Sequence, residues 1–425
     1  MISIPSAIQS ILTALRSRGH EACPVGGCVR DSLRGVEPED WDICTSAIPE
    51  ETMSCFPEGD TIPTGIKHGT VTVRSGGVTS EVTTYRTEGE YSDGRRPDSV
   101  TFVRSLSEDL RRRDFTVNAM ALDEAGEVID LFGGQADLSD HLVRCVGEPN
   151  ERFQEDALRI LRALRFASKL DFGIEAKTGS AVMQNRALLY GLSAERVWKE
   201  LKGILVGPGC GRVLRNYSAV LAILLPELGT ESIERRSAAI AAAPADLCLR
   251  MALLLFGLDG QKSAEILKRL HCDNATRSRT LDLKEALEAP LPRTREGQLK
   301  LAQKLGWADA LLVAGLRDKK YAAELKTLQA ENPCLTVHDL CLSGDDLMRL
   351  GAPTGEVIGA ILRLMLGCVW RKEAENTRES LLPLAHKMLH TASVIDAART
   401  GKLSTPRNPL PESPLPNTKK NSVPG

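Results

Sequence analysis

The sequence lacks the features of a membrane protein and of a disulfide-rich secreted protein. Its longest apolar run, from Met251 to Leu258, has eight residues, whereas a membrane-spanning helix needs about 20. Its 11 cysteines are scattered and form no C-x-x-C pair, which argues against a disulfide framework and a zinc site. Residues 1–20 read as an amphipathic helix and not as a signal peptide. We therefore expect a cytoplasmic protein with free thiols and no membrane partner.

The chain also lacks an excess of positive charge and a cluster of histidines. Its formal net charge is −2 over 425 residues, so any contact with nucleic acid must use a local basic patch. The seven histidines are scattered, and the dipeptide His338-Asp339 has no other histidine nearby. This argues against the histidine-rich metal site of a phosphohydrolase. At about 150 residues per domain, the length suggests about three structural units.

Strand-forming and helix-forming patterns divide the chain in two. Residues 1–147 mix both patterns: residues 69–86 read as two strands joined by a Ser-Gly-Gly turn, and residues 126–134 as a further strand and turn. From residue 148 to 400 the apolar residues repeat at helical spacing. Residues 401–425 hold six prolines and no aromatic residue, which predicts disorder. The predicted fold class is α+β: a mixed N-terminal part, followed by an all-α part.

Two carboxylates, Asp40 and Asp42, stand two positions apart in an otherwise apolar, strand-like stretch. In a strand, residues i and i+2 point to the same face, so both carboxylates should project together while Trp41 and Ile43 face a core. Adjacent carboxylates repel each other unless a cation lies between them, and Mg²⁺ prefers oxygen ligands of this kind. Considered alone, the stretch also fits a solvated turn.

A phosphate-binding pattern lies upstream of the aspartate pair. A strand is predicted to end at Gly26-Gly27, and a helix to begin near Cys28 with Arg30 in its first turn. Glycines let the backbone approach a phosphate closely, and the N–H groups at a helix start attract anions. Arg30 could add a charged two-pronged contact. A Gly-Gly pair alone fits a simple tight turn equally well.

A third carboxylate, Glu81, lies in the second strand of the predicted hairpin, among β-branched residues. Such a carboxylate is costly on a buried face, so it either faces solvent or joins Asp40 and Asp42 on a neighbouring strand. Three carboxylates with two Mg²⁺ ions form the two-metal site of phosphoryl and nucleotidyl transfer. There one ion activates an attacking hydroxyl, and the other holds the triphosphate and stabilises the leaving pyrophosphate.

These stretches resemble the class II tRNA nucleotidyltransferase and bacterial poly(A) polymerase family, a branch of the polymerase-β-like nucleotidyltransferases. The resemblance rests, in order and spacing, on GGCVRDSLRGVEPEDWDICTSA, EVTTYR, RRRDFTVNAMA, DLFGGQADL and RFQEDALRILRALRFASKLDFGIE. It extends from Val25 to about Glu200. It implies a nucleotidyltransferase head with a small mixed β-sheet, followed by an all-α neck, body and tail. The implied division is a catalytic head at 1–147, a neck with the nucleotide-selecting helix at 148–210, a body at 211–330, a tRNA-binding tail at 331–400 and the disordered residues 401–425.

The resemblance implies that C, C and A are added to the 3′ end of tRNA without a nucleic-acid template. The tRNA 3′-hydroxyl would attack the α-phosphate of CTP or ATP, and pyrophosphate would leave. In this chemistry Asp40 and Asp42 would hold the Mg²⁺ ions, and Glu81 would assist the attacking hydroxyl. Gly27 and Arg30 would contact the phosphates of the nucleotide.

The motif RRRDFTVN adds further residues to the implied nucleotide site. Arg113 matches the nucleotide-contacting arginine of the family, and Asp114 and Asn118 would orient the sugar and the local turn. The preceding Arg111 and Arg112 fit a solvated surface as well as they fit contacts with RNA.

Base selection is predicted to reside in residues 155–166, which read as one helix that places Asp156 and Arg159 one turn apart. Cytosine and adenine each present an amino donor beside a bare ring nitrogen, whereas uracil and guanine present a carbonyl beside a ring N–H. An acceptor at Asp156 and a donor at Arg159 would admit C and A, at ~1–3 kcal/mol per good pair. This agrees with the protein template that the resemblance implies. Arg162 and Arg165 would extend toward the phosphates.

Alternatives within and outside the family stay open at this point. Poly(A) polymerases of the family usually carry long basic extensions, whereas residues 401–425 hold four basic residues. Enzymes that add only CC lack part of a loop that this chain keeps at residues 87–110. A non-catalytic RNA-binding relative should have lost a carboxylate or the template pair, and all of these are present. We therefore expect full CCA addition.

Overall fold

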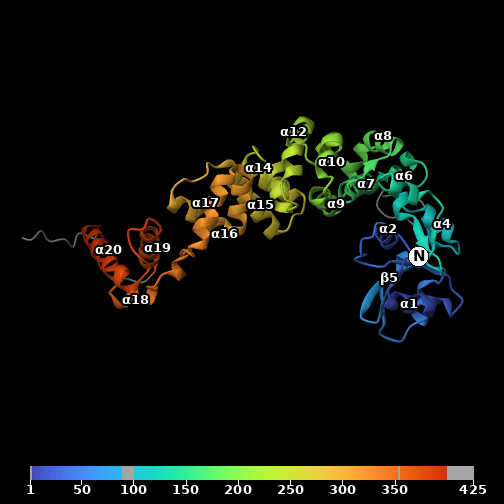
Figure 1. The fold of residues 1–425 in the computed structure, drawn as a ribbon, viewed down its shortest axis with the longest axis horizontal. Coiled ribbons are helices and arrows are strands. Elements are labelled where there is room, and N and C mark those ends of the chain that lie inside the picture. The colour runs from blue at the N-terminus through green and yellow to red at the C-terminus, as the bar shows by residue number, and fades with distance from the viewer. Residues whose placement is uncertain (1, 89–99, 353–354, 400–425) are drawn as a thin grey trace, which may run out of the picture. The chain divides into compact units, whose positions relative to one another are not determined.

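The computed structural model describes residues 2–88, 100–352 and 355–399, with side chains up to Thr391. The chain divides into two compact units, one ending at Pro290 and the other beginning at Leu291, coloured from blue to yellow and from orange to red in Figure 1. The predicted disorder of residues 401–425 and the centre of the loop at 87–110, residues 89–99, lie outside the described residues. None of the helices in the described ranges is long and apolar enough to cross a membrane.

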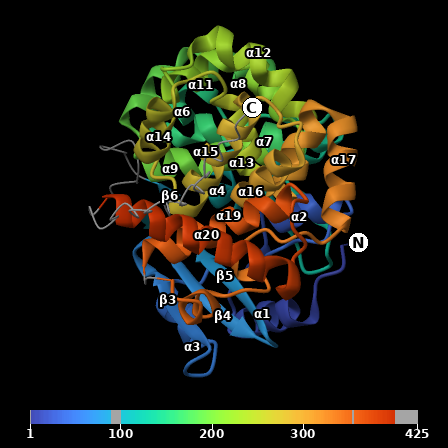
Figure 2. The same ribbon diagram turned by 90° about the vertical axis from the view of Figure 1, so that its left-hand side faces the viewer.

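A five-stranded mixed sheet forms the centre of the head. Its strands follow the order β1-β2-β5-β4-β3, with bounds β1 Ala22–Pro24, β2 Ile43–Thr45, β3 Thr61–Gly65, β4 Thr70–Ser75 and β5 Val78–Thr84. β2 and β5 are parallel, and the other neighbours are antiparallel. The amphipathic helix α1 (Ser6–Arg16) buries its apolar side in the same core as the inner faces of β4 and β5, and Figure 2 shows it beside them. The opening helix and the mixed sheet agree with the sequence prediction.

The β4–β5 hairpin is closed by a two-residue turn. Ser75 pairs with Val78, and Gly76 and Gly77 between them have φ angles of 56° and 81°. Two consecutive positive φ angles define the type I′ turn that suits a twisted hairpin, and glycine adopts them without a steric penalty. The turn fixes the register that places Glu81 opposite Thr72.

Replacing Gly77 with alanine should therefore destabilise the protein by about 1–2 kcal/mol, because an L-residue is strained at this φ. Apart from its chain neighbours, no heavy atom of the described residues would lie within 4 Å of a Cβ at this position, so the cost is one of backbone conformation. Urea unfolding measures it. Gly260→Ala, at a helix start with ordinary φ and equal space, is the matched control and should change stability by a few tenths of a kcal/mol. Equal stability of the two variants would contradict the assignment of the turn.

Smaller elements complete the head. They comprise α2 (Gly27–Leu33), α3 (Pro49–Ser54), η1 (Ile66–His68), α4 (Leu106–Arg111), η2 (Thr116–Asn118), α5 (Gly134–Ser139) and the short pairs β6 (Arg86–Glu88) with β7 (Val100–Phe102) and β8 (Met120–Leu122) with β9 (Val128–Asp130). The strand and turn expected at residues 126–134 are thus confirmed as β9 and the turn that leads into α5.

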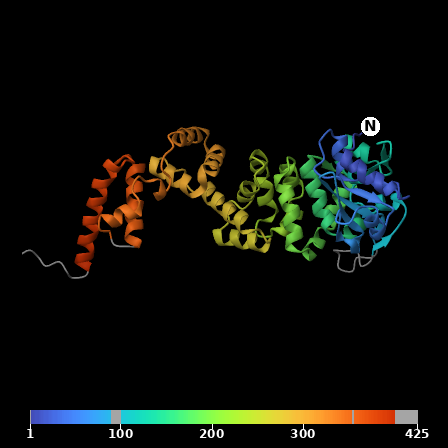
Figure 3. The same cartoon turned by 90° about the horizontal axis from the view of Figure 1, so that it is seen from below.

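The chain after residue 148 is helical, as predicted, apart from β11 (Gly173–Ile174), which pairs with β10 (Leu142–Val143). In the first unit the helices are α6 (Pro149–Glu155), α7 (Leu158–Leu170), α8 (Ala176–Gln184), η3 (Arg186–Gly191), α9 (Ala194–Val206), α10 (Cys210–Asn216), α11 (Ser218–Leu224), α12 (Gly229–Ala242), α13 (Leu247–Leu254), α14 (Gly260–Arg269) and α15 (Asn274–Glu288). Figure 3 shows them in green to yellow.

One hydrophobic core joins the end of the head to these helices. It includes Phe115 of the head, Phe153 and Leu164 of α6 and α7, and Leu221 and Leu267 of α11 and α14. This core continues across the predicted domain boundaries at 147/148 and 210/211. The boundaries do not separate hydrophobic cores, and they remain a prediction about function. The core also ties the nucleotide-selecting segment firmly to the head.

The second unit has its own core. Its helices are α16 (Arg295–Arg317), α17 (Lys319–Ala330), η4 (Val337–Asp339), α18 (Gly344–Arg349), α19 (Glu356–Trp370) and α20 (Arg378–Arg399). α16 is interrupted at Gly306, where φ is 76°. The buried Tyr321, Met365 and Trp370 belong to one cluster in this unit, so the predicted boundary at 330/331 falls within it.

Candidate active site

Three carboxylates meet where β2 and β5 run parallel. Asp40 and Asp42 lie in the extended segment just before β2, which itself begins at Ile43. The segment is anchored because Val25 N–H donates to the Asp42 carbonyl (2.9 Å). Trp41 and Ile43 are buried, whereas Asp40 and Asp42 are exposed. The predicted alternation of buried and exposed side chains is therefore confirmed, although both aspartates precede the first residue of β2.

The pKa of Asp42 is affected by burial and by the other two carboxylates. Burial on its protein side and the charges of Asp40 and Glu81 raise the pKa of Asp42 to about 6, although Arg113 acts in the opposite direction. A cation held by the carboxylates would remove this repulsion, and carboxylate oxygens suit a hard divalent ion. In the described ranges no group of three or more His, Cys, Asp or Glu side chains is arranged as a metal cluster. A metal would therefore rely on the aspartate pair and on substrate phosphates, as is common for Mg²⁺.

The raised pKa predicts how the metal-free protein responds to pH. Because the folded-state pKa of about 6 exceeds the ordinary value of 3.8, the folded state keeps a proton that the unfolded state releases between these values, and stability falls as pH rises. Asp42→Asn should therefore melt at a higher temperature than the wild type at pH 7.5 and at the same temperature below pH 4. Thermal melts in chelator across this range test it. A constant difference at all pH values would contradict the assigned cause.

The glycine turn predicted at Gly26-Gly27 is present, and α2 begins at Gly27. Gly26 has a φ of 82°, which favours glycine, and a Cβ there would lie 3.1 Å from Nη1 of Arg113. Arg30 lies in α2 with its guanidinium buried: it donates to Asp31 through Nε and Nη2 (2.9 and 2.7 Å) and to Asn118 Oδ1 through Nη1 (2.6 Å). Asn118, expected to orient the sugar, thus also holds Arg30.

The motif RRRDFTVN is held by a buried carboxylate that the sequence did not single out. Asp109 accepts from Arg112 (2.7 Å) and Arg113 (3.1 Å). Burial acts to raise the pKa of Asp109, but Arg113 and Arg112 outweigh it and hold this pKa below its usual value. Nε of Arg113 is buried and has no hydrogen-bond partner within the described part of the chain.

Asp114 holds the next arginine. Nε of Arg162 donates to Asp114 Oδ2 (2.7 Å), and Nδ2 of Asn118 donates to Oδ1 (3.1 Å). Burial opposes ionisation, but Arg162 and these hydrogen bonds lower the pKa of Asp114 to about 2. Arg165 pairs with Glu200, and its guanidinium lies 4.2 Å from the ring centroid of Phe166. The guanidinium groups of Arg162 and Arg165 are thus fixed before any ligand binds.

The prediction of one continuous helix through Asp156 and Arg159 is wrong. α6 ends at Glu155, Asp156 is extended with φ −137° and ψ 103°, and α7 begins at Leu158. The physical reason is that Oδ1 of Asp156 accepts from the N–H of Leu158 (3.0 Å). Aspartate satisfies a helix start in this way instead of continuing a helix. Asp156 therefore stands at a junction between two helices, just ahead of the turn that carries Arg159.

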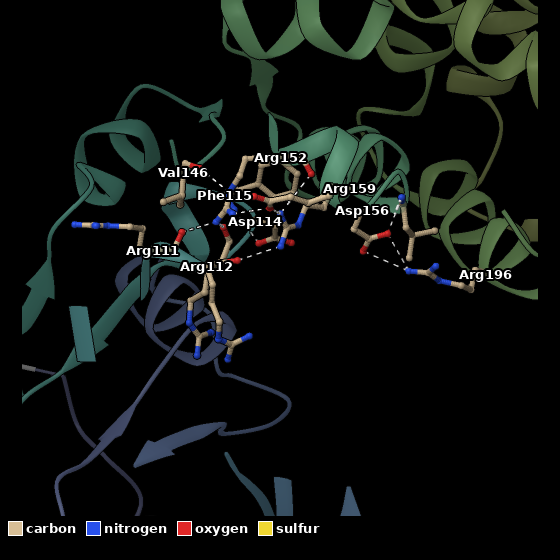
Figure 4. Close-up of polar contacts among 12 residues, drawn as sticks. Arg111, Arg112, Asp114, Phe115, Val146, Arg152, Asp156, Arg159 and Arg196 are labelled. Carbon is tan, nitrogen blue, oxygen red and sulfur yellow. Dashed lines mark hydrogen bonds and ion pairs between the residues drawn. The ribbon is translucent and has the colours of Figure 1, made fainter. Parts of the chain in front are cut away.

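Both template residues have protein partners at this junction, shown in Figure 4. Nη2 of Arg196, from α9, donates to the two oxygens of Asp156 (3.1 and 3.3 Å). Arg159 donates through Nη1 to Glu155 (2.6 Å) and through Nη2 to the carbonyl of Arg112 (3.1 Å). Arg159 is thereby tied to the backbone of the RRRDFTVN motif.

A single cavity of about 810 Å³ brings these groups together. All twelve residues predicted for the site line it: Asp40, Asp42, Glu81, Gly27, Arg30, Arg113, Asp114, Asn118, Asp156, Arg159, Arg162 and Arg165. The sequence did not predict His68, Arg86, Lys169, Arg196 and Lys199 as part of the lining. Arg86 and Lys169 lie within quoted motifs but were given no role, and the other three lie outside these motifs. With ten arginine and lysine and five aspartate and glutamate side chains in its lining, the cavity suits a polyanion with a metal ion.

Family models match both units of the chain. The poly(A) polymerase head domain matches residues 23–144, and a putative tRNA nucleotidyltransferase domain 2 matches residues 246–385. The CCA-adding enzyme of Geobacillus kaustophilus is 40% identical over 382 residues, which cover 87% of this chain and 94% of the relative. The CCA-adding enzyme of Limosilactobacillus reuteri is 53% identical over 209 residues, 49% of this chain and 51% of the relative.

Solved structures show the same similarity. The Bacillus stearothermophilus CCA-adding enzyme in complex with CTP superposes with a TM-score of 0.75 at 32% identity, over 93% of this chain and 98% of that chain. The Thermotoga maritima CCA-adding enzyme complexed with tRNA shares the fold, with a TM-score of 0.65 at 21% identity over 92% and 97% of the two chains. The resemblance noted from the sequence is confirmed, and nucleotidyltransferases of this kind use divalent metal. The chain belongs to the CCA-adding enzymes, within the nucleotidyltransferases.

Proposed function

We propose that this protein adds C, C and A in turn to the 3′ end of tRNA, taking CTP and ATP as substrates and releasing pyrophosphate. The observation that carries the proposal is that one cavity is lined both by the three carboxylates and by Asp156 and Arg159. The groups for nucleotidyl transfer and the groups for base selection can therefore act on the same nucleotide. A poly(A) polymerase or a CC-only enzyme of the same family would share this cavity, so the reaction products decide between them.

The carboxylates supply the chemistry of transfer in this proposal. Asp40 and Asp42 would hold Mg²⁺, which when bound activates a hydroxyl and stabilises the charge on a triphosphate. Glu81, on the parallel neighbour of β2, accepts a hydrogen bond from the attacking tRNA 3′-hydroxyl. The raised pKa of Asp42, caused first by burial and then by the charges of Asp40 and Glu81, supports the assignment, because a cation bound there would stabilise the ionised carboxylate.

The arginines position the triphosphate. Arg30, Arg113 and Arg162 line the cavity, and each is held by a neighbouring carboxylate: Asp31, Asp109 and Asp114, respectively. Guanidinium groups fixed before binding lose little conformational entropy when phosphate oxygens reach them. Gly27 lets the triphosphate approach the backbone, and Arg165 extends the positive lining.

Asp156 and Arg159 select the base. The carboxylate of Asp156 accepts from the amino group of cytosine or adenine, and Arg159 donates to the adjacent bare ring nitrogen. Uracil and guanine would place a carbonyl against the carboxylate and an N–H against the guanidinium, which leaves buried charged groups unpaired. The tRNA itself would be held by the helical part of the chain after residue 148, and the reaction would take place in the cytoplasm.

A tRNA transcript that ends at the discriminator base tests the proposed function. With Mg²⁺ and CTP it should grow by two nucleotides, and with CTP plus ATP by three and then stop. A stop at two in the presence of ATP would identify a CC-only enzyme. A long ladder with ATP alone would identify a poly(A) polymerase, and absence of any extension would favour a non-catalytic RNA-binding relative.

A further inference from the structure

Arg196 stands in the nucleotide cavity although no motif of the sequence marks it. It lies in the first turns of α9, the helix that packs along α7, and it lines the cavity together with Lys199. Its side chain is 20% exposed. Its position beside Asp156 therefore results from the packing of α9 on α7, and not from proximity in the sequence.

The two terminal nitrogens of Arg196 have different roles. Nη2 donates to both oxygens of Asp156, which fixes the plane of that carboxylate. Nη1 is buried and has no hydrogen-bond partner in the described part of the chain. A buried donor without a partner costs desolvation free energy, which a ligand acceptor would recover. The free donor is thus a candidate contact for the nucleotide.

The order of groups along this wall of the cavity defines a pattern. Figure 4 shows Asp156 between Arg159 and Arg196, so the wall presents a donor, an acceptor and a donor. Adenine presents the complementary series along one edge: N1 accepts, the N6 amino group donates and N7 accepts. Cytosine offers only the first two, because a C5–H group stands where adenine has N7.

We propose that Arg196 is a specificity-determining residue for adenine, whose Nη1 donates to N7 of the incoming ATP while its Nη2 holds Asp156. The inference rests on the proposed function, since it concerns the step that adds A. It gives ATP one contact that CTP does not make. Guanine also carries N7, but its O6 carbonyl faces the Asp156 carboxylate, so the contact with Arg196 does not admit it.

The test compares ATP with 7-deaza-ATP, in which a C–H group replaces N7, for the single addition of A to a tRNA transcript ending in CC. The wild type should use 7-deaza-ATP about tenfold less efficiently in kcat/KM, the effect of losing one hydrogen bond from a charged donor. Arg196→Met should lower the efficiency with ATP and use the two nucleotides equally. Arg212→Met, which removes an arginine from the exposed ion pair with Asp171 outside the cavity, should keep the tenfold ratio.

A purely structural role of Arg196 would lower the use of ATP and 7-deaza-ATP by the same factor, so a ratio that persists in Arg196→Met overturns the inference. Equal use of both nucleotides by the wild type overturns it without any variant. Arg196→Lys covers the case in which Arg196→Met does not fold: the lysine ammonium does not reproduce the two separated nitrogens of the guanidinium, one on Asp156 and one on N7, so the ratio should again fall toward one. Failure of the wild type to add A from ATP would instead overturn the proposed function, and this inference with it.

Discussion

Asp42→Asn should abolish the addition of both C and A, with a loss of about three orders of magnitude in rate. The substitution keeps the shape of the side chain but removes the charge that, with Asp40, would hold the metal. Single-turnover extension of a tRNA transcript in Mg²⁺, once with CTP and once with ATP on a transcript ending in CC, measures both additions.

Two controls make this result specific. Asp140→Asn changes an exposed aspartate of the same unit that does not line the cavity, and it should keep the wild-type rate. Asp42→Asn itself should still bind CTP, because the template pair and the arginines are intact. A rate within tenfold of the wild type would show that Asp42 is not part of the catalytic centre.

Asp156→Asn should change which nucleotides are accepted while the carboxylates at Asp40 and Asp42 stay in place. The amide oxygen of asparagine can still accept from Leu158 and Arg196, as Oδ1 of Asp156 does, which leaves the amide nitrogen to face the base as a donor. A donor there suits the carbonyl of uracil or guanine. The efficiency with UTP and GTP relative to CTP and ATP should rise by about 10- to 100-fold, which corresponds to ~1–3 kcal/mol per base contact.

Competition assays with all four nucleotides, read by sequencing of the products, measure this shift. Arg159→Ala should also loosen base choice while sparing the metal site. Asp171→Asn, at an exposed aspartate outside the cavity, is the matched control and should keep the wild-type preference. If Asp156→Asn and Arg159→Ala lower all four nucleotides equally, the two residues support the fold and do not read the base.

The sequence predicts the chemical groups of the site better than it predicts their geometry. Asp40, Asp42 and Glu81 could be identified because alternation in extended chain fixes the direction of side chains. The Gly26-Gly27 turn could be identified because few residues tolerate its backbone. Contacts that depend on packing between distant segments could not: Arg196 reaches Asp156 from 40 positions away.

The helix break at Asp156 shows a different limit. The spacing of apolar residues through 155–166 is helical on both sides of the break, and periodicity does not register one extended residue. What breaks the helix is a hydrogen bond from the N–H of Leu158 to the side chain of Asp156, a local competition with the helical pattern. The break also separates Asp156 from the regular part of α7, where it can pair with Arg196.

We propose that one cavity accepts both C and A and excludes U and G by the same protein groups. Competition binding of the four nucleoside triphosphates to the tRNA-free protein in Mg²⁺ tests it most directly. We expect a single site at which CTP and ATP displace each other, while UTP and GTP displace neither at comparable concentrations. Simultaneous binding of CTP and ATP, or displacement of CTP by UTP as effective as by ATP, would contradict it.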